Sequence, residues 1–223
     1  MKGRIAEVFD SVQGEGIYIG EKQIFVRFFG CNLECKYCDT KLDCFKEYEP
    51  LELLEEINLY RNGQHSISFT GGEPLFQKDF LKEVLKLSRA RGFKNYLETN
   101  GTLPAALEEV IEHVHIVAMD LKLPSSTWLS SFWDEHRKFL KIASHKEVFL
   151  KAIICETTEE DDFVEAVKLV KEINKSAILV LQPNDFDRPE KIIEKIKRFK
   201  SLSRKENVTA CVIPQMHKLA GLR

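Results

Sequence analysis

Short apolar runs rich in β-branched and aromatic residues alternate along this chain with longer stretches of helical periodicity. This alternation constrains the fold most, because parallel strands need long crossovers, which are usually helices. The expected strands are Gln23–Phe29, His65–Thr70, Asn95–Thr99, His115–Leu121, Val148–Ile154, Ala177–Leu181 and Val208–Ile213. The expected helices are Leu51–Tyr60, Asp79–Ala90, Pro104–Glu112, Glu159–Ile173 and Pro189–Phe199, with Thr127–Ala143 irregular or helical.

About six strand–helix units are too few to close an eight-stranded barrel. We therefore expect an α/β fold whose parallel strands form an open, partial barrel in a single domain, 1–223, with a doubly wound sheet as the alternative. In either fold, ligands bind at the carboxyl ends of the strands. Chemically unusual residues follow five of these strands: Cys31, Gly71 to Glu73, Glu98 to Gly101, Asp120 to Lys122, and Gln182 with Pro183.

Composition excludes few functions. The formal net charge of -2 gives no basic excess of the kind that binds nucleic acid. No apolar run approaches the length of a membrane span, and the first residues show no apolar signal segment. We therefore expect a cytoplasmic protein that binds neither membrane nor nucleic acid.

The segment from Gly30 to Thr40 reads GCNLECKYCDT and places three cysteines within eight residues. In a reducing compartment, so tight a group favours metal binding over disulfides. Three thiolates on one loop can bind three irons of a cubane cluster and leave the fourth iron open for chemistry. The alternative is a structural zinc or iron–sulfur site, in which Cys44 could be a fourth ligand.

The string GCNLECKYC resembles the signature of the radical S-adenosylmethionine (SAM) superfamily, and Thr70 to Pro74 (TGGEP) resembles its glycine-rich loop. The resemblance implies a partial barrel, a [4Fe–4S] cluster on Cys31, Cys35 and Cys38, and SAM as the source of a 5'-deoxyadenosyl radical. It also implies SAM contacts, namely Tyr37 near the adenine, Gly72 and Glu73 in the loop, and Asp120, Leu121, Lys122 and Gln182.

Three further strings, FDSVQGEG (Phe9 to Gly16), Asp39-Thr40 and PQMHK (Pro214 to Lys218), resemble the family of 7-carboxy-7-deazaguanine synthases. That resemblance implies a lyase that converts 6-carboxy-5,6,7,8-tetrahydropterin to 7-carboxy-7-deazaguanine with loss of ammonia, in deazapurine (queuosine-type) biosynthesis. It implies Mg2+ bound by Thr40, and substrate contacts from Val12, Gln13, Gly14, Glu15, Arg27, Thr70 and His217. Glu15 can accept hydrogen bonds from the pterin edge, and Arg27 can bind the substrate carboxylate in a bidentate manner. His217 is expected to close the substrate pocket, with no proton-transfer role assigned.

One string departs from this pattern. Asp120-Leu121-Lys122 replaces a Ser-Pro-Lys string found in many such synthases. Asp-x-Lys strings also occur in glycyl-radical-enzyme activases, which act on a protein glycine, so an activase is the alternative function. The synthase resemblance further implies a homodimer and an external, flavodoxin-like electron donor.

Overall fold

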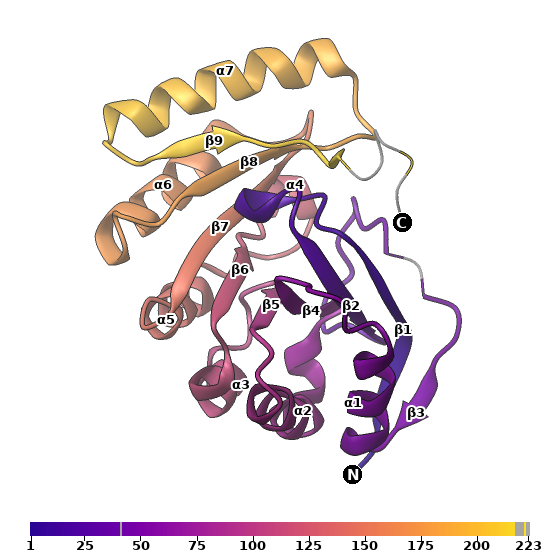
Figure 1. The fold of residues 1–223 in the computed structure, drawn as a ribbon. Helices are drawn as coiled ribbons and strands as arrows, with labels where there is room; N and C mark the ends of the chain where they lie inside the picture. Colours follow the sequence, from indigo (N-terminus) through magenta and orange to yellow (C-terminus); the bar gives the residue numbers. More distant parts are fainter. Residues whose placement is uncertain (41, 217–220, 222–223) are drawn as a thin grey trace.

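The computed structural model describes residues 1–40, 42–216 and 221. Within these residues, nine strands form one sheet in the order β3-β1-β2-β4-β5-β6-β7-β8-β9. Figure 1 shows that this sheet curves but stays open. The strands are β1 (Gly3–Val12), β2 (Lys22–Phe28), β3 (Lys46–Tyr48), β4 (Ser66–Gly71), β5 (Asn95–Thr99), β6 (Ile116–Asp120), β7 (Glu147–Ile154), β8 (Leu179–Pro183) and β9 (Ala210–Val212).

The sheet has a parallel part and an antiparallel margin. In the described part of the chain, the seven strands from β2 to β9 in the sheet order pair in parallel, and each overlaps one of the seven strands expected from the sequence. β1 pairs antiparallel with both β2 and β3. The open, partial barrel is therefore confirmed, and the doubly wound sheet is not formed.

The first strand, β1, was not expected from the sequence. Its burial pattern does not alternate regularly, because most of its residues are partly buried on either face, and a strand is recognised from sequence chiefly by alternation. Gly3 lies so close to Phe80 that a Cβ atom would approach that ring to 2.1 Å. The strand ends at Val12, so the string from Phe9 to Gly16 begins within the sheet and leaves it at the site described below.

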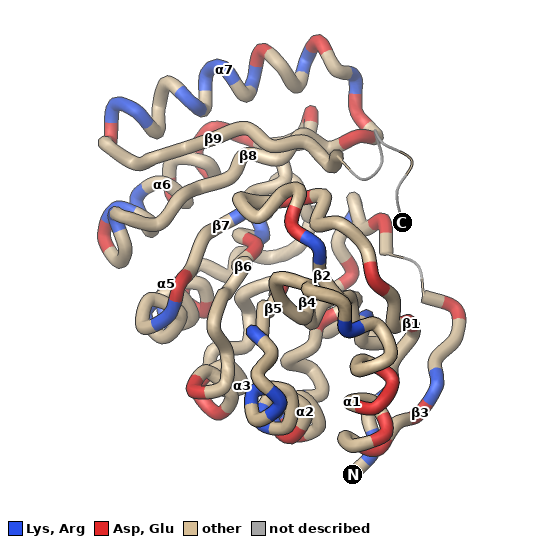
Figure 2. The backbone as a smooth tube through the Cα atoms, in the orientation of Figure 1, with Lys and Arg blue, Asp and Glu red and all other residues tan. Residues whose placement is uncertain are grey.

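Helices cover the outer, convex face of the sheet (Figure 1). In α2, the buried residues Phe80, Leu81, Val84, Leu85 and Ser88 recur with the helical period, which is the pattern of a helix with one face on a core. Figure 2 shows acidic and basic residues along α7, whose opposite face packs inward. The helices are α1 (Pro50–Leu59), α2 (Lys78–Ala90), α3 (Pro104–Val110), α4 (Pro124–Thr127), α5 (Trp133–Ala143), α6 (Glu160–Ile173) and α7 (Pro189–Lys205), with short 3-10 turns η1 (Gly16–Tyr18), η2 (Pro74–Gln77) and η3 (Ile111–His113).

An apolar cluster lies on the inner face of the sheet. It contains Tyr96 and Phe149, against which Ile17 and Tyr18 of η1 pack. Gly16 has a φ of +65°, and a Cβ atom there would lie 2.6 Å from Phe149, so glycine permits both the turn and the close approach. This packing leaves the polar side chains gathered toward the carboxyl ends of the parallel strands.

Candidate active site

The loop after β2 carries the three cysteines of the predicted cluster site. The N–H of Lys36 donates to the carbonyl of Thr127 at 2.9 Å, which fastens the middle of this loop to α4. The side chains of Cys31, Cys35 and Cys38 line one cavity, which we call the inner cavity. Burial raises the pKa of the thiols of Cys31 and Cys35.

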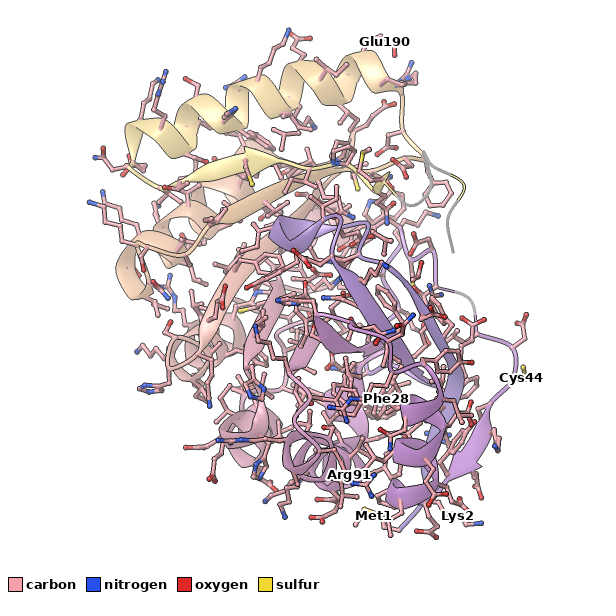
Figure 3. All side chains as sticks on the ribbon, in the orientation of Figure 1. Met1, Lys2, Phe28, Cys44, Arg91 and Glu190 are labelled. Carbon is pink, nitrogen blue, oxygen red and sulfur yellow. The ribbon has the colours of Figure 1, made fainter. Side chains whose placement is uncertain are left out.

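The inner cavity is lined by residues of the cysteine loop, of β4 to β8 and the loops that follow these strands, and of the segment after β9: Cys31, Leu33, Cys35, Tyr37, Cys38, Asp39, Thr40, Thr70, Gly71, Gly72, Glu98, Thr99, Asn100, Asp120, Lys122, Lys151, Ile153, Pro183, Asn184 and Gln215. Among the described residues, no three His, Cys, Asp or Glu side chains converge on a single metal ion. Cys44 is exposed, and Figure 3 shows it on the outer loop that leads to β3.

The glycine-rich loop after β4 packs directly on the cysteine loop. The N–H of Gly72 donates to the carbonyl of Phe28 at 2.9 Å, and the N–H of Glu73 donates to the carbonyl of Gly30 at 2.9 Å. A Cβ atom on Gly72 would lie 2.0 Å from the Gly30 oxygen, so a side chain at this position is excluded. Three thiols in one cavity, beside a loop without side chains, form a donor set that fits an iron–sulfur cluster with a ligand next to it.

Glu73 has a different position from the neighbouring glycines. Its side chain is fully buried, and its carboxylate accepts hydrogen bonds from the N–H of Leu75 at 3.0 Å and from the N–H of Asn100 at 2.7 Å. Burial raises the pKa of Glu73 to about 7. The side chain thus joins the loop after β4 to the loop after β5, and the residue does not line the inner cavity.

A charged cluster lies at the end of β6. The Lys122 ammonium is 2.9 Å from Asp120 Oδ2 and 3.4 Å from the Tyr37 hydroxyl, and it also lies 5.5 Å from the centre of the Tyr37 ring. Burial opposes ionisation of Asp120, but Lys122 and Lys151 outweigh it and lower the pKa of that carboxyl. The three residues that the sequence assigns to one cofactor therefore meet in one wall of the inner cavity.

Two other predicted SAM contacts are buried. Leu121 is 1% exposed and belongs to the main apolar core, while its N–H donates to the carbonyl of Lys151 at 2.7 Å. Gln182 pairs in register with Ile153, which lines the inner cavity, so the two side chains share a face of the sheet. Within the described residues, Gln182 Oε1 is buried without a hydrogen-bond partner.

A second cavity, which we call the outer cavity, adjoins the first. It is lined by Phe9, Val12, Gln13, Gly14, Glu15, Phe25, Arg27, Asp39, Thr40, Thr70, Gly71, Glu98, Asp185, Phe186 and Gln215. Six of these residues also line the inner cavity, namely Asp39, Thr40, Thr70, Gly71, Glu98 and Gln215. The two cavities are therefore contiguous, and the residues predicted for substrate and for cofactor lie on either side of a shared wall.

Hydrogen bonds preorganise the outer cavity. Gln13 Nε2 donates to Gln23 Oε1 at 3.0 Å and to Glu98 Oε1 at 2.8 Å, and Thr70 Oγ1 donates to Glu98 Oε2 at 3.0 Å. The Arg27 guanidinium lies 5.2 Å from the centre of the Phe9 ring. His217, predicted to close this pocket, lies outside the described residues.

The site assignment from sequence left out several residues that line these cavities, among them the polar side chains of Glu98, Lys151 and Gln215. Glu98 stands at the end of a predicted strand, and Gln215 lies in the PQMHK string. Lys151 stands inside the apolar run VFLKAII, where a single charged residue is an unexpected feature. A lysine in a buried strand needs a partner for its charge, which is a signal that sequence reasoning could have used.

No helix among the described residues has the length and apolar character needed to cross a bilayer.

Comparisons with known proteins agree with this geometry. The family described as the Radical SAM superfamily matches residues 25–196. The 7-carboxy-7-deazaguanine synthase of Geobacter sulfurreducens is 36% identical over 97% of this chain and 96% of its own length, and that of Archaeoglobus fulgidus is 34% identical over 100% of both chains. The crystal structure of QueE from Escherichia coli has the same fold, with a TM-score of 0.67 at 21% identity over 95% of this chain and 94% of QueE. The chain therefore belongs to the radical SAM superfamily and, within it, to the family of 7-carboxy-7-deazaguanine synthases.

Proposed function

We propose that this protein converts 6-carboxy-5,6,7,8-tetrahydropterin to 7-carboxy-7-deazaguanine with loss of ammonia. The observation that carries the proposal is the contiguity of the two cavities, one lined by the three thiols and the other by Glu15 and Arg27. The radical must form next to the substrate atom with which it reacts, and two contiguous cavities permit this.

The inner cavity would hold the cofactors. Cys31, Cys35 and Cys38 would ligate a [4Fe–4S] cluster, and Gly72, which lines the same cavity, would contact SAM through its backbone. When bound, the cluster and SAM supply the 5'-deoxyadenosyl radical that initiates the reaction. Tyr37 would offer its ring to the adenine, while Asp120, Lys122 and Gln182 would bind polar groups of SAM. Glu73 would support SAM binding indirectly, by holding the glycine-rich loop in place. Leu121, whose side chain is in the core, would contact SAM through its backbone.

The outer cavity would bind the pterin. Glu15 and the segment from Val12 to Gly14 would accept and donate hydrogen bonds along the edge of the planar ring. Arg27 would bind the substrate carboxylate, and the Phe9 ring keeps its guanidinium in a defined place. Thr70 would contact the substrate where the cavities meet, and His217 would close the pocket.

We also propose that Mg2+ binds between the two cavities. Thr40 lines both of them, and its Oγ1 lies 3.5 Å from Asp39 Oδ1. A hydroxyl, substrate oxygens and waters suit a hard cation with few protein ligands. Thr40 would hold the ion, which would supply a hard cationic partner for substrate oxygens.

The last part of the proposal concerns the location, the oligomeric state and the electron donor of the enzyme. We propose that it works in the cytoplasm as a homodimer and receives electrons from a flavodoxin-like protein. A one-electron donor is required because the chemistry begins with reductive cleavage of SAM.

Anaerobic reconstitution with iron and sulfide tests the function. The enzyme is then incubated with 6-carboxytetrahydropterin, SAM, Mg2+ and a reductant, and ammonia and deazaguanine are measured. Product that requires SAM and Cys31 is the expected result. Cleavage of SAM to 5'-deoxyadenosine without deazaguanine would overturn the pterin assignment and favour the activase.

A further inference from the structure

Lys151 is a buried cation in the middle of a core strand. It is 6% exposed, and its neighbours along β7, Leu150 and Ala152, are fully buried on the opposite face. An unpaired ammonium in such a position would strongly destabilise the folded protein, because its buried charge would have no compensation. A lysine is therefore retained here only with partners, and those partners indicate its role.

The two carboxylates beside Lys151 come from opposite sides of the site. Its ammonium donates to Glu15 Oε2 at 2.7 Å and lies 3.4 Å from Asp120 Oδ1. Asp120 is its neighbour in register on β6 and lines the inner cavity. Glu15 comes from the segment after β1 and lines the outer cavity. One ammonium thus joins a residue of the cofactor side to a residue of the substrate side.

The two ion pairs of Lys151 are not equivalent. Asp120 has a second cation, because Lys122 lies 2.9 Å from its other oxygen. The Glu15 carboxylate is shared between the ammonium of Lys151 and the amide of Gln215, whose Nε2 donates to Glu15 Oε1 at 2.6 Å. Lys151 hydrogen-bonds to Glu15 at 2.7 Å, whereas among the described residues its 3.4 Å contact with Asp120 Oδ1 forms no hydrogen bond. The main effect of removing Lys151 is therefore expected at the substrate side.

We propose that Lys151 is a positioning residue that holds the Glu15 carboxylate, ionised and fixed in direction, for recognition of the pterin edge. This role rests on the proposed function, in which Glu15 accepts hydrogen bonds from the substrate. An ionised carboxylate accepts hydrogen bonds and donates none, which suits a ring edge rich in N–H groups. Lys151 acts through Glu15 and makes no contact with the substrate itself.

The experiment is a double-mutant cycle on K151M, E15Q and the pair K151M/E15Q. The dissociation constant for 6-carboxytetrahydropterin is measured by fluorescence on the protein without its cofactors, and KM and kcat are measured on the reconstituted enzyme. Each single variant is expected to weaken pterin binding about 10- to 100-fold, the range for loss of a charge-assisted hydrogen bond. The double variant is expected to bind as E15Q does, within about twofold, because Lys151 acts only through Glu15.

Two further variants separate positioning from structure. K171M removes an exposed lysine that pairs with Glu206 at 2.8 Å and lines neither cavity. This variant should bind the pterin as the unsubstituted protein does. K151Q keeps a hydrogen-bond donor without the charge, and it carries the test if K151M does not fold. It should raise KM for the pterin by more than it lowers kcat.

The outcomes are distinct. Pterin affinity in K151M or K151Q equal to that of K171M would overturn the role of Lys151, as would effects of K151M and E15Q that simply add. Failure of the unsubstituted enzyme to bind or convert the pterin would instead overturn the proposed function, and the role of Lys151 with it.

Discussion

The carboxylate of Glu73 accepts the backbone N–H of Asn100 at 2.7 Å inside the protein, so the loops after β4 and β5 share one buried acid. Asn100 in turn donates from its side chain to Asn32 Oδ1 at 2.8 Å, on the cysteine loop. The glycine-rich loop, the end of β5 and the cysteine loop are therefore held as one unit. A cofactor bound between these three segments would therefore be surrounded by residues that are already held in place.

This buried acid predicts a pH dependence of stability. Burial raises the pKa of Glu73 from 4.5 to about 7 in the folded protein, so the folded state holds this proton more tightly than the unfolded state. The stability contributed by the protonated group is fully present below pH 4.5 and is lost as the pH rises through about 7. The free energy of unfolding of the unsubstituted protein relative to E73Q should fall by about 3 kcal/mol across this window. Urea unfolding of both proteins at several pH values measures it, and a constant difference would contradict the prediction.

The cysteines of the loop should be needed to bind the cluster but not to fold the protein. We expect C31A to lose the visible absorbance of a reconstituted cluster and all product formation, while its circular dichroism stays unchanged. The thiol lines a cavity and does not belong to the apolar core. C44S is the matched control, because Cys44 is exposed outside the cavity, and it should keep both cluster and activity. Unfolding of C31A would favour a structural metal site.

Gly72 should tolerate no side chain. In G72A the new Cβ would lie 2.0 Å from the Gly30 oxygen, so the glycine-rich loop or the cysteine loop must move. Overpacking of this kind costs about 1–3 kcal/mol, and we expect a lower melting temperature together with weaker SAM binding. G63A is the control, since a Cβ there meets no atom within 4 Å and only its positive φ of +74° is strained. Normal SAM affinity in G72A would show that the close contact is unimportant.

Arg27 should matter for the substrate and not for the cluster. R27A is expected to raise KM for the pterin about 10- to 100-fold, as loss of a charge-assisted bond to a carboxylate would do, with the cluster spectrum unchanged. R61A is a matched control, because the Arg61 guanidinium also lies over a phenylalanine, 4.5 Å from the centre of the Phe93 ring, outside both cavities. Steady-state kinetics on the two variants compare them directly. Equal KM values would remove Arg27 from the substrate site.

The sequence by itself determined the features that depend on local spacing. The cysteines of GCNLECKYC are close in the chain, so no fold is needed to see that they share one loop. Helix α2 is predictable because its apolar residues recur with the period of one helix face. The parallel strands are predictable because short apolar runs alternate with such helices. The partial barrel is the consequence of this order, and the ends of its strands mark the site.

Only the tertiary structure decided which distant residues meet. Glu15 and Lys151 are 136 positions apart, and they form an ion pair because Ile17 and Tyr18, in the segment after β1, pack against Phe149 of β7. Glu73 belongs to a recognisable string, yet burial turned its carboxylate toward Asn100 and away from the cavity. The strand β1 was missed for the same reason, since its pairing with β2 and β3 stabilises a segment whose own pattern is weak. Local pattern fixes elements, but burial and charge pairing depend on neighbours that the chain brings together only when it folds.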